Sequence, residues 1–374
     1  MTRPRLIGTV GAVHTAASAP ALIVLGPSLG TTAALWDDVA ADLASELRVL
    51  RFDLPGHGES PAATEPFSIG ELAEAVVDLV DSIGGGAFAY AGVSAGGAVG
   101  LELALRYPER VSTLAVLCAA ARIGSAEGWA ERAERVRASG TASLVSLSAG
   151  RWFAPGYLDA NPQAGGAELS RLVEVDDESY ALCCEALAAF DAREAVRGIA
   201  VPTLIVAGEF DVATPPEQLE ALAAAIPDAA YVLLRGVAHL PARESPREVG
   251  ALIRSRIGGM RVRREVLGDA HVDAAVAATT AQTAAWQDFI TRYAWGEIWS
   301  RPGLSRRERS LLTLAALVTG GHRHELAMHV RAALGNGLSR EEIGEAIMHT
   351  AVYAGVPAAN SAFGVAVRVF EEED

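Results

Sequence analysis

The chain has 374 residues, enough for two average domains, and its 51% of hydrophobic residues can supply a core to each. A net charge of −15 at pH 7 argues against nucleic acid and anionic membrane surfaces as partners. All 31 residues counted as Lys+Arg are arginine, which excludes chemistry that needs a lysine Schiff base. Three cysteines without a CxxC pair, and no pattern of a signal peptide or membrane span, lead us to expect a cytoplasmic protein.

Residues 1–257 predict an α/β domain with a mostly parallel sheet. Short apolar runs alternate there with helical patterns, and such runs suit strands that are buried on both faces of a sheet. The expected strands are 21–26, 48–53, 87–92, 112–117, 203–208 and 230–236. The strand pattern stops between residues 122 and 190, where we predict a helical cap over the sheet.

The stretch AGVSAGG contains the pattern G-x-S-x-G, with the serine at position 94. It follows a predicted strand and precedes a predicted helix, and in that context it predicts a nucleophile elbow that exposes Ser94 above the sheet. The N–H of Ala95 is then the first expected donor of an oxyanion hole. The second is expected from Leu29, in the glycine-containing loop GPSLGTT after the first core strand.

A nucleophilic serine needs a general base and a carboxylate that orients it. His239 lies in GVAHLP, after the last predicted strand, where this fold places its base. Asp211, in GEFDVATPP just past a strand end, is the predicted carboxylate, and Glu209 is the alternative. The order Ser94, Asp211, His239 is that of the α/β hydrolases.

The first domain resembles the 3-oxoadipate enol-lactonase branch of the α/β hydrolases. The resemblance is carried by PSLGTTAALWDDVA, RFDLPGHGES, AGVSAGG, VAGEFDVATPP and GVAHLP. It implies hydrolysis of a small anionic lactone through an acyl-enzyme, without a cofactor. Esterases and cofactor-free perhydrolases of the same superfamily share the triad, so an enzyme with a different substrate preference is the alternative.

The pattern becomes purely helical after the first domain. We predict an exposed linker at 258–264, where two glycines precede an arginine cluster, and an all-α domain at 265–374. Two capping boxes predict helix starts within that domain: Ser305 with Glu308, and Ser339 with Glu342.

The second domain resembles 4-carboxymuconolactone decarboxylase over essentially its whole length. The stretches that carry the resemblance are VLGDAHVDAA, DFITRYAWGEIWSRPGLSRRERSLLTLAAL and HELAMHVRAALGNGLSREEIGEAIMHTAVYAGVPAANSAF. It implies a cofactor-free decarboxylation whose product is the enol-lactone that the first domain would open. It also implies a homo-oligomer formed through this domain, and a domain that only assembles subunits without catalysis is the alternative.

Glu325 and His329 are four residues apart and share one face of a predicted helix. A carboxylate beside a histidine raises the pKa of the ring and fixes its tautomer, so we predict His329 as the proton donor of the decarboxylase. A helix-surface ion pair is the alternative.

Other residues of the second domain are candidates for substrate binding. Arg292 and Arg309 offer bidentate guanidinium groups for the two substrate carboxylates, although ordinary surface positions are equally consistent with the pattern. Glu297 lies among tryptophans that would raise its pKa or only cover its stem. His322 is expected at the edge of the pocket. The spacing of histidines in GGHRHELAMH does not match known zinc sites, so we predict no metal.

Overall fold

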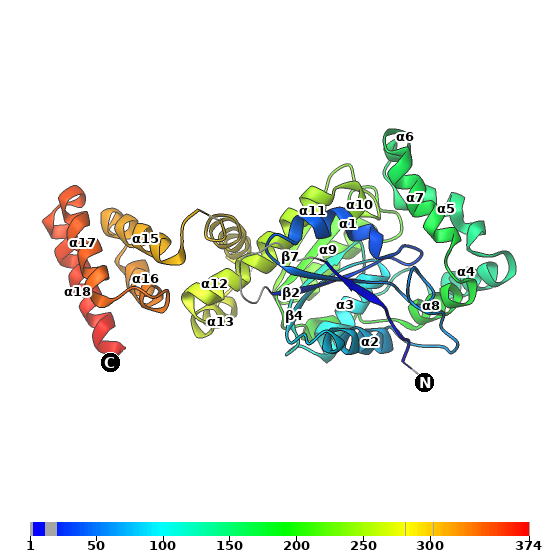
Figure 1. The fold of residues 1–374 in the computed structure, drawn as a ribbon, viewed down its shortest axis with the longest axis horizontal. Helices are drawn as coiled ribbons and strands as arrows, with labels where there is room; N and C mark the ends of the chain where they lie inside the picture. The colour runs from blue at the N-terminus through cyan, green and yellow to red at the C-terminus, as the bar shows by residue number, and fades with distance from the viewer. Residues whose placement is uncertain (1–2, 12–20, 281, 302, 374) are drawn as a thin grey trace. The chain divides into compact units, whose positions relative to one another are not determined.

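The computed structural model describes residues 3–11, 21–280, 282–301 and 303–373. The chain forms two compact units, Met1–Ile253 and Arg254–Asp374. Figure 1 shows the first unit in blue to yellow-green and the second in yellow to red.

A seven-stranded sheet with the order β1-β3-β2-β4-β5-β6-β7 forms the centre of the first unit. Only β1 is antiparallel to its neighbour, so the predicted mostly parallel sheet is confirmed. The strands are β1 (Gly8–Val10), β2 (Leu22–Gly26), β3 (Arg48–Phe52), β4 (Phe88–Val93), β5 (Val111–Leu117), β6 (Thr203–Gly208) and β7 (Ala229–Leu234). The sequence did not predict β1, because three partly exposed residues carry no readable strand pattern.

Helices cover both faces of this sheet. In Figure 1, α1 and α11 lie above it and α2 and α3 below it, and each pair is in contact. Ser68 and Glu71 form a capping box that fixes the start of α2. The helices of this layer are η1 (Ala33–Trp36), α1 (Asp37–Leu43), α2 (Ile69–Ser82), α3 (Ala95–Arg106), η3 (Ala195–Gly198), α9 (Pro216–Ala225), α10 (Pro241–Glu244) and α11 (Pro246–Ile253).

The segment between β5 and β6 is helical and forms a cap. Its helices are α4 (Ala126–Ser139), η2 (Thr141–Leu144), α5 (Val145–Trp152), α6 (Tyr157–Ala160), α7 (Pro162–Val173) and α8 (Asp177–Ala189), and α4 packs along α8. Two buried anchors attach the cap to the sheet layer. Glu168 of α7 forms an ion pair of 2.8 Å with Arg243 of α10, and Glu244 accepts hydrogen bonds of 2.6 Å from the N–H groups of Ala154 and Ala238.

The second unit is helical throughout its described residues. It contains η4 (Arg254–Gly258), α12 (Gly259–Leu267), α13 (Asp269–Ala277), α14 (Ala284–Ile290), η5 (Thr291–Ile298), α15 (Arg306–Gly320), α16 (Arg323–Gly335), α17 (Arg340–Ala354) and α18 (Val356–Glu372). Both η4 and η5 are π-helical. The two predicted capping boxes form at the starts of α15 and α17. Buried aliphatic residues of α15 to α18 make its main core.

The structure contradicts the prediction that residues 258–264 form an exposed linker. Residues 254–267 are helical, and Gly258, Gly259 and Met260 are buried. A methyl group on Gly259 would lie 2.3 Å from the carbonyl oxygen of Thr291, so this glycine permits a close crossing of α12 and η5. The two glycines therefore indicate close packing and not a flexible segment. The two units divide earlier, after Ile253. Across the part of the chain that the structure describes, every helix is too short or too polar to span a membrane.

Candidate active sites

The elbow at Ser94 joins the end of β4 to the start of α3. Ser94 has φ of 54°, a conformation that non-glycine residues rarely adopt and that costs about 1–3 kcal/mol. A methyl group on Gly92 would lie 2.2 Å from the carbonyl oxygen of Gly96, and one on Gly96 would lie 2.4 Å from that of Gly26. These three glycines let β2, β4 and α3 meet backbone to backbone, which holds the serine in its strained turn.

His239 and Asp211 meet beside this elbow. The Nδ1 atom of His239 lies 2.9 Å from Oδ2 of Asp211, and both side chains are buried. Burial alone would raise the pKa of Asp211, but attraction to His239, together with hydrogen bonds from His239 and Thr214, lowers it below its usual value. The carboxylate is thus held ionised, and it fixes the ring so that Nε2 is left for another partner.

The alternative carboxylate, Glu209, lies elsewhere. It forms an ion pair of 2.7 Å with Arg235 and accepts a hydrogen bond of 2.9 Å from the N–H of Gly236. Asp211 is the carboxylate that contacts His239. Its other oxygen accepts hydrogen bonds from the N–H groups of Ala213 and Thr214, which close a tight turn after β6.

Two backbone N–H groups are available near the serine. Leu29 and Ala95 are buried, and neither N–H donates a hydrogen bond to another described residue. Buried backbone donors are nearly always paired, so two such groups beside a strained serine mark a place where an oxygen of a ligand binds.

His57 holds the loop that carries Leu29, a role that the sequence did not reveal. Its Nε2 accepts a hydrogen bond of 3.0 Å from the N–H of Gly30, and its Nδ1 lies 2.9 Å from the carbonyl oxygen of Pro55. These partners require a neutral ring with the proton on Nδ1. Burial lowers the pKa of His57 to about 4, so the ring keeps this state at neutral pH. The one sequence feature that could have indicated this role is the glycine-rich turn DLPGHGES, which contains His57.

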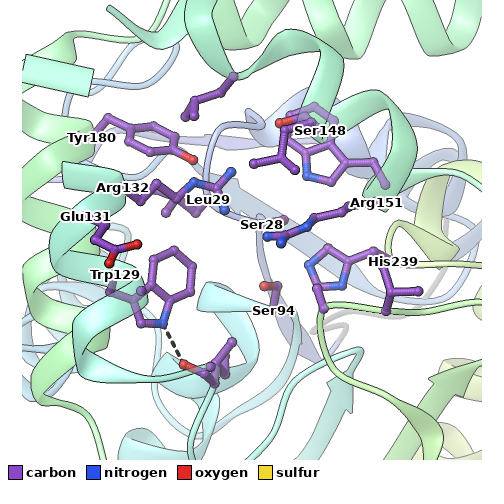
Figure 2. Close-up of a pocket in the computed structure, with 18 of the residues that line it drawn as sticks. Ser28, Leu29, Ser94, Trp129, Glu131, Arg132, Ser148, Arg151, Tyr180 and His239 are labelled. Carbon is purple, nitrogen blue, oxygen red and sulfur yellow. Dashed lines mark hydrogen bonds between the residues drawn. The ribbon is translucent and has the colours of Figure 1, made fainter. Parts of the chain in front are cut away.

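A cavity of about 410 Å³ opens over Ser94 and His239, between the sheet layer and the cap. Figure 2 shows Ser94 and His239 at one end, with Arg132 and Arg151 extending into the space from the cap. Its size is typical of sites for small ligands. The cap contributes three arginines to its lining: Arg132, Arg135 and Arg151.

In the second unit His329 packs beside two tryptophans that also contact each other. Its ring stacks at 6.4 Å on both Trp295 and Trp299. The pKa of His329 is lowered to about 4, first by burial and then by the charge of His271, and Glu325 opposes this shift only weakly. Glu325 thus acts on His329 in the expected direction, but burial and His271 outweigh it, and the expected net rise of the pKa does not occur. Glu325 is exposed on α16, so solvent screens its charge, whereas the tryptophans remove water from the ring.

The other residues predicted for the decarboxylase lie on η5, on α15 and at the cap position before α16. Glu297 and His322 are exposed, at the end of η5 and at the cap position before α16. Arg292 is half-buried on η5, and Arg309 of α15 donates a hydrogen bond of 2.7 Å to the carbonyl oxygen of Arg301. A second cavity, of about 310 Å³, lies among α15, α16 and α18, and none of the predicted residues lines it.

The histidine-rich stretch does not converge on one point. His322 and His324 are exposed, whereas His329 is half-buried. Among the described residues no group of three or more His, Cys, Asp or Glu side chains comes together in a way that could hold a metal ion.

Comparison with known proteins relates each unit to a different family. Residues 21–246 match the family model of the alpha/beta hydrolase fold, and residues 284–368 match that of the carboxymuconolactone decarboxylase family. The 3-oxoadipate enol-lactonase 2 of Acinetobacter baylyi is 36% identical over 198 residues, which are 53% of this chain and 74% of that protein. The 4-carboxymuconolactone decarboxylase of the same organism is 46% identical over 114 residues, 30% of this chain and 85% of that protein.

A solved structure shows the same likeness for the first unit. The crystal structure of the enol-lactonase from Burkholderia xenovorans LB400 superposes with a TM-score of 0.65 at 34% sequence identity. The match covers 67% of this chain and 96% of that one. Homologues of two enzymes are thus fused in one chain.

Proposed function

Because the chain belongs to the α/β hydrolase family over residues 21–246 and to the carboxymuconolactone decarboxylase family over residues 284–368, we propose that it catalyses two consecutive reactions. The second unit removes CO2 from 4-carboxymuconolactone, and the first unit hydrolyses the resulting 3-oxoadipate enol-lactone to 3-oxoadipate. The observation that carries the proposal is this pairing, because the product of one relative's reaction is the substrate of the other's.

In the first unit Ser94 is the nucleophile. His239 takes its proton through Nε2 while Oγ attacks the lactone carbonyl, and Asp211 stabilises the imidazolium that forms. The N–H groups of Leu29 and Ala95 stabilise the oxyanion. The ring C–O bond then breaks, the enol leaves and tautomerises to a ketone, and water activated by His239 releases the acid from the acyl-enzyme.

In the second unit the substrate supplies its own electron sink. As CO2 leaves, the electron pair of the broken C–C bond moves through the ring alkene into the lactone carbonyl, and one proton then returns to carbon. His329 is the group proposed to handle that proton. The lowered pKa of His329 favours the neutral ring in the free protein. A dianion bound beside it would raise this pKa again, so His329 would take up a proton when the substrate binds. Arg292 and Arg309 are proposed to bind the two carboxylates.

The proposal includes assembly through the second unit. Val352, Tyr353 and Val356 are 77%, 76% and 74% exposed at the end of α17 and the start of α18. Large apolar side chains exposed together are typical of protein contacts. We place the activity in the cytoplasm, because Cys118, Cys183 and Cys184 are free thiols.

The test is to supply 4-carboxymuconolactone to the full chain and follow the products by NMR. The wild-type protein should give CO2 and 3-oxoadipate, with enol-lactone as a transient. The variant Ser94→Ala should release CO2 at the wild-type rate and accumulate enol-lactone. Loss of both reactions in a folded Ser94→Ala protein would contradict two separate sites, and no CO2 release from the wild type would contradict the decarboxylase.

A further inference from the structure

Three buried polar atoms without a hydrogen-bond partner line the cavity above Ser94. They are Nε of Arg132, Oγ of Ser148 and the hydroxyl oxygen of Tyr180. Ser148 is 1% exposed and Tyr180 is fully buried. An unpaired buried polar group is destabilising, about 1–3 kcal/mol each, so three around one cavity call for a ligand that pairs them.

The chemistry of the three groups fits an anion. Each can donate a hydrogen bond, and Arg132 also carries a positive charge. Burial raises the pKa of Tyr180 more than the neighbouring Arg132 lowers it, so the hydroxyl keeps its proton and remains a donor. Among the described residues Arg132 forms no ion pair, whereas Arg137, one turn further along α4, pairs with Glu178 and Glu185.

Two aromatic rings position Arg132. Its guanidinium carbon lies 5.5 Å from the ring centre of Trp129 and 5.7 Å from that of Tyr180. Stacking of this kind uses the face of the guanidinium and leaves the N–H groups at its edge free to bind two oxygens. In Figure 2 the guanidinium group of Arg132 lies beside the hydroxyl of Tyr180, inside the cavity.

Tyr180 lies next to the loop that carries Leu29, the proposed oxyanion donor. A methyl group on Gly30 would approach the Tyr180 ring to 3.3 Å, and Gly30 directly follows Leu29. A small molecule bound to Arg132 and Tyr180 therefore has its other end near Leu29 and Ser94. A five-membered ring with a two-carbon arm fits within a cavity of about 410 Å³.

We propose that Arg132 and Tyr180 form the carboxylate subsite of the lactonase, binding the acetate arm of the lactone while its ring carbonyl meets Ser94. This inference rests on the proposed function of the first unit. Arg132 is the specificity-determining residue, Tyr180 adds a second donor to the same carboxylate, and Ser148 lines another part of the cavity.

The experiment compares an anionic and a neutral substrate on the full chain. 3-Oxoadipate enol-lactone carries the acetate arm, and 5-methyl-3H-furan-2-one has the same ring with a methyl group in its place. Arg132→Met keeps the length of the side chain and removes its charge and donors. It should lower kcat/KM for the anionic lactone on the order of 100-fold, mainly through KM, and leave the neutral lactone within a few-fold.

Arg135→Met is the matched control, because it removes the same charge from an exposed position of the same cavity. It should change the ratio of the two substrates only a few-fold. An equal effect of Arg132→Met on both substrates would overturn the proposal, as would a larger selectivity change for Arg135→Met or Arg151→Met.

Tyr180→Phe separates binding from folding. Removing an unpaired buried hydroxyl should leave the melting temperature of the free protein unchanged or raise it, while KM for the anionic lactone rises. A lowered melting temperature with unchanged KM would assign the hydroxyl a structural role and contradict the subsite.

Inhibition by succinate distinguishes failure of the subsite from failure of the proposed function. Succinate should compete with the neutral lactone in the wild type and in Arg135→Met, and much more weakly in Arg132→Met. This pattern would support the carboxylate subsite even if 3-oxoadipate enol-lactone were not hydrolysed. Equal inhibition of all three proteins would overturn it.

Discussion

The two candidate sites differ in how completely one copy of the chain encloses them. In the first unit Ser94, Asp211 and His239 are 6%, 3% and 4% exposed, and a sheet layer and a cap surround them. In the second unit Glu297, His322 and Glu325 are exposed, whereas His329 is half-buried beside Trp295 and Trp299. An enclosed site is defined by the fold of one chain, whereas an open helical surface needs a further element to exclude water.

The surroundings of the two proposed catalytic histidines, His239 and His329, illustrate this difference. His239 has a buried carboxylate 2.9 Å away, so its tautomer is fixed and its charged form is stabilised when it forms. Burial and the charge of His271 lower the pKa of His329 to about 4, and the charge of Glu325 offsets this shift only in part. Under the proposed function, we therefore expect the lactonase to be preorganised in the free protein and the decarboxylase to become competent when its dianionic substrate binds.

The largest expected effect tests preorganisation in the first unit. Asp211→Asn should lower kcat for lactone hydrolysis by about 10⁴-fold, because the amide no longer holds His239 in the productive tautomer. Steady-state kinetics on the enol-lactone measures it. Glu209→Gln is the control and should stay near the wild-type rate, since Glu209 contacts Arg235; a comparable loss there would assign the orienting role to Glu209.

The next effect tests the second unit. His329→Ala should lower the rate of CO2 release by about 10²- to 10⁴-fold, the range of general acid–base catalysis, and leave lactone hydrolysis unchanged. If His329 must take up a proton, kcat/KM of the wild type should fall about tenfold per pH unit above its pKa of about 4. His324→Ala, at an exposed position of the same helix, should keep the wild-type rate and profile. A flat profile would refute protonation of His329.

The stability of the first unit in acid tests whether His57 is buried in its neutral form. The ordinary pKa of a histidine near 6.5 falls to about 4 for buried His57 in the folded protein. The folded state thus binds fewer protons than the unfolded state between these values, so its stability is complete above pH 6.5 and decreases as the pH falls toward 4. The decrease should reach about 3 kcal/mol. Chemical unfolding of the first unit from pH 7.5 to 4.5 should show it, and His57→Gln should reduce the slope; an unchanged slope would contradict the assignment.

The smallest effect probes the open surface of the second unit. Val352→Asp places a charge among exposed apolar side chains and should reduce the proposed oligomer to smaller species in sedimentation experiments. CO2 release should fall by about tenfold if assembly completes the site. Val173→Asp, an exposed valine on the cap, is the control and should leave the assembly intact. A wild-type monomer with full decarboxylase activity would show that the second unit works alone.

Much of the first unit could be predicted because its signals are local in sequence. Strand runs, the elbow around Ser94 and the positions of Asp211 and His239 after strand ends all follow from the order of elements along the chain. The role of His57 could not be predicted, because it depends on a contact with Gly30, 27 residues away.

The second unit was harder to predict for a physical reason. Capping boxes fixed two helix starts, since a cap is a local interaction. The pKa of His329 depends on Trp295 and Trp299, which approach from another helix, and helical spacing identified only the nearer and weaker influence of Glu325. The buried glycines at 258 and 259 were misleading because a pattern of glycine does not distinguish flexibility from close packing.

The three interlocking glycines at the elbow restrict how this chain can change in evolution. A side chain on Gly92 or Gly96 would collide with backbone atoms of Gly96 or Gly26, which no other substitution can remove, whereas one on Gly26 would meet the hydroxyl of Tyr90. A larger core residue can be accommodated when a neighbouring side chain becomes smaller, but no substitution removes a backbone carbonyl oxygen. We therefore expect descendants of this chain to lose the serine chemistry before they lose these glycines.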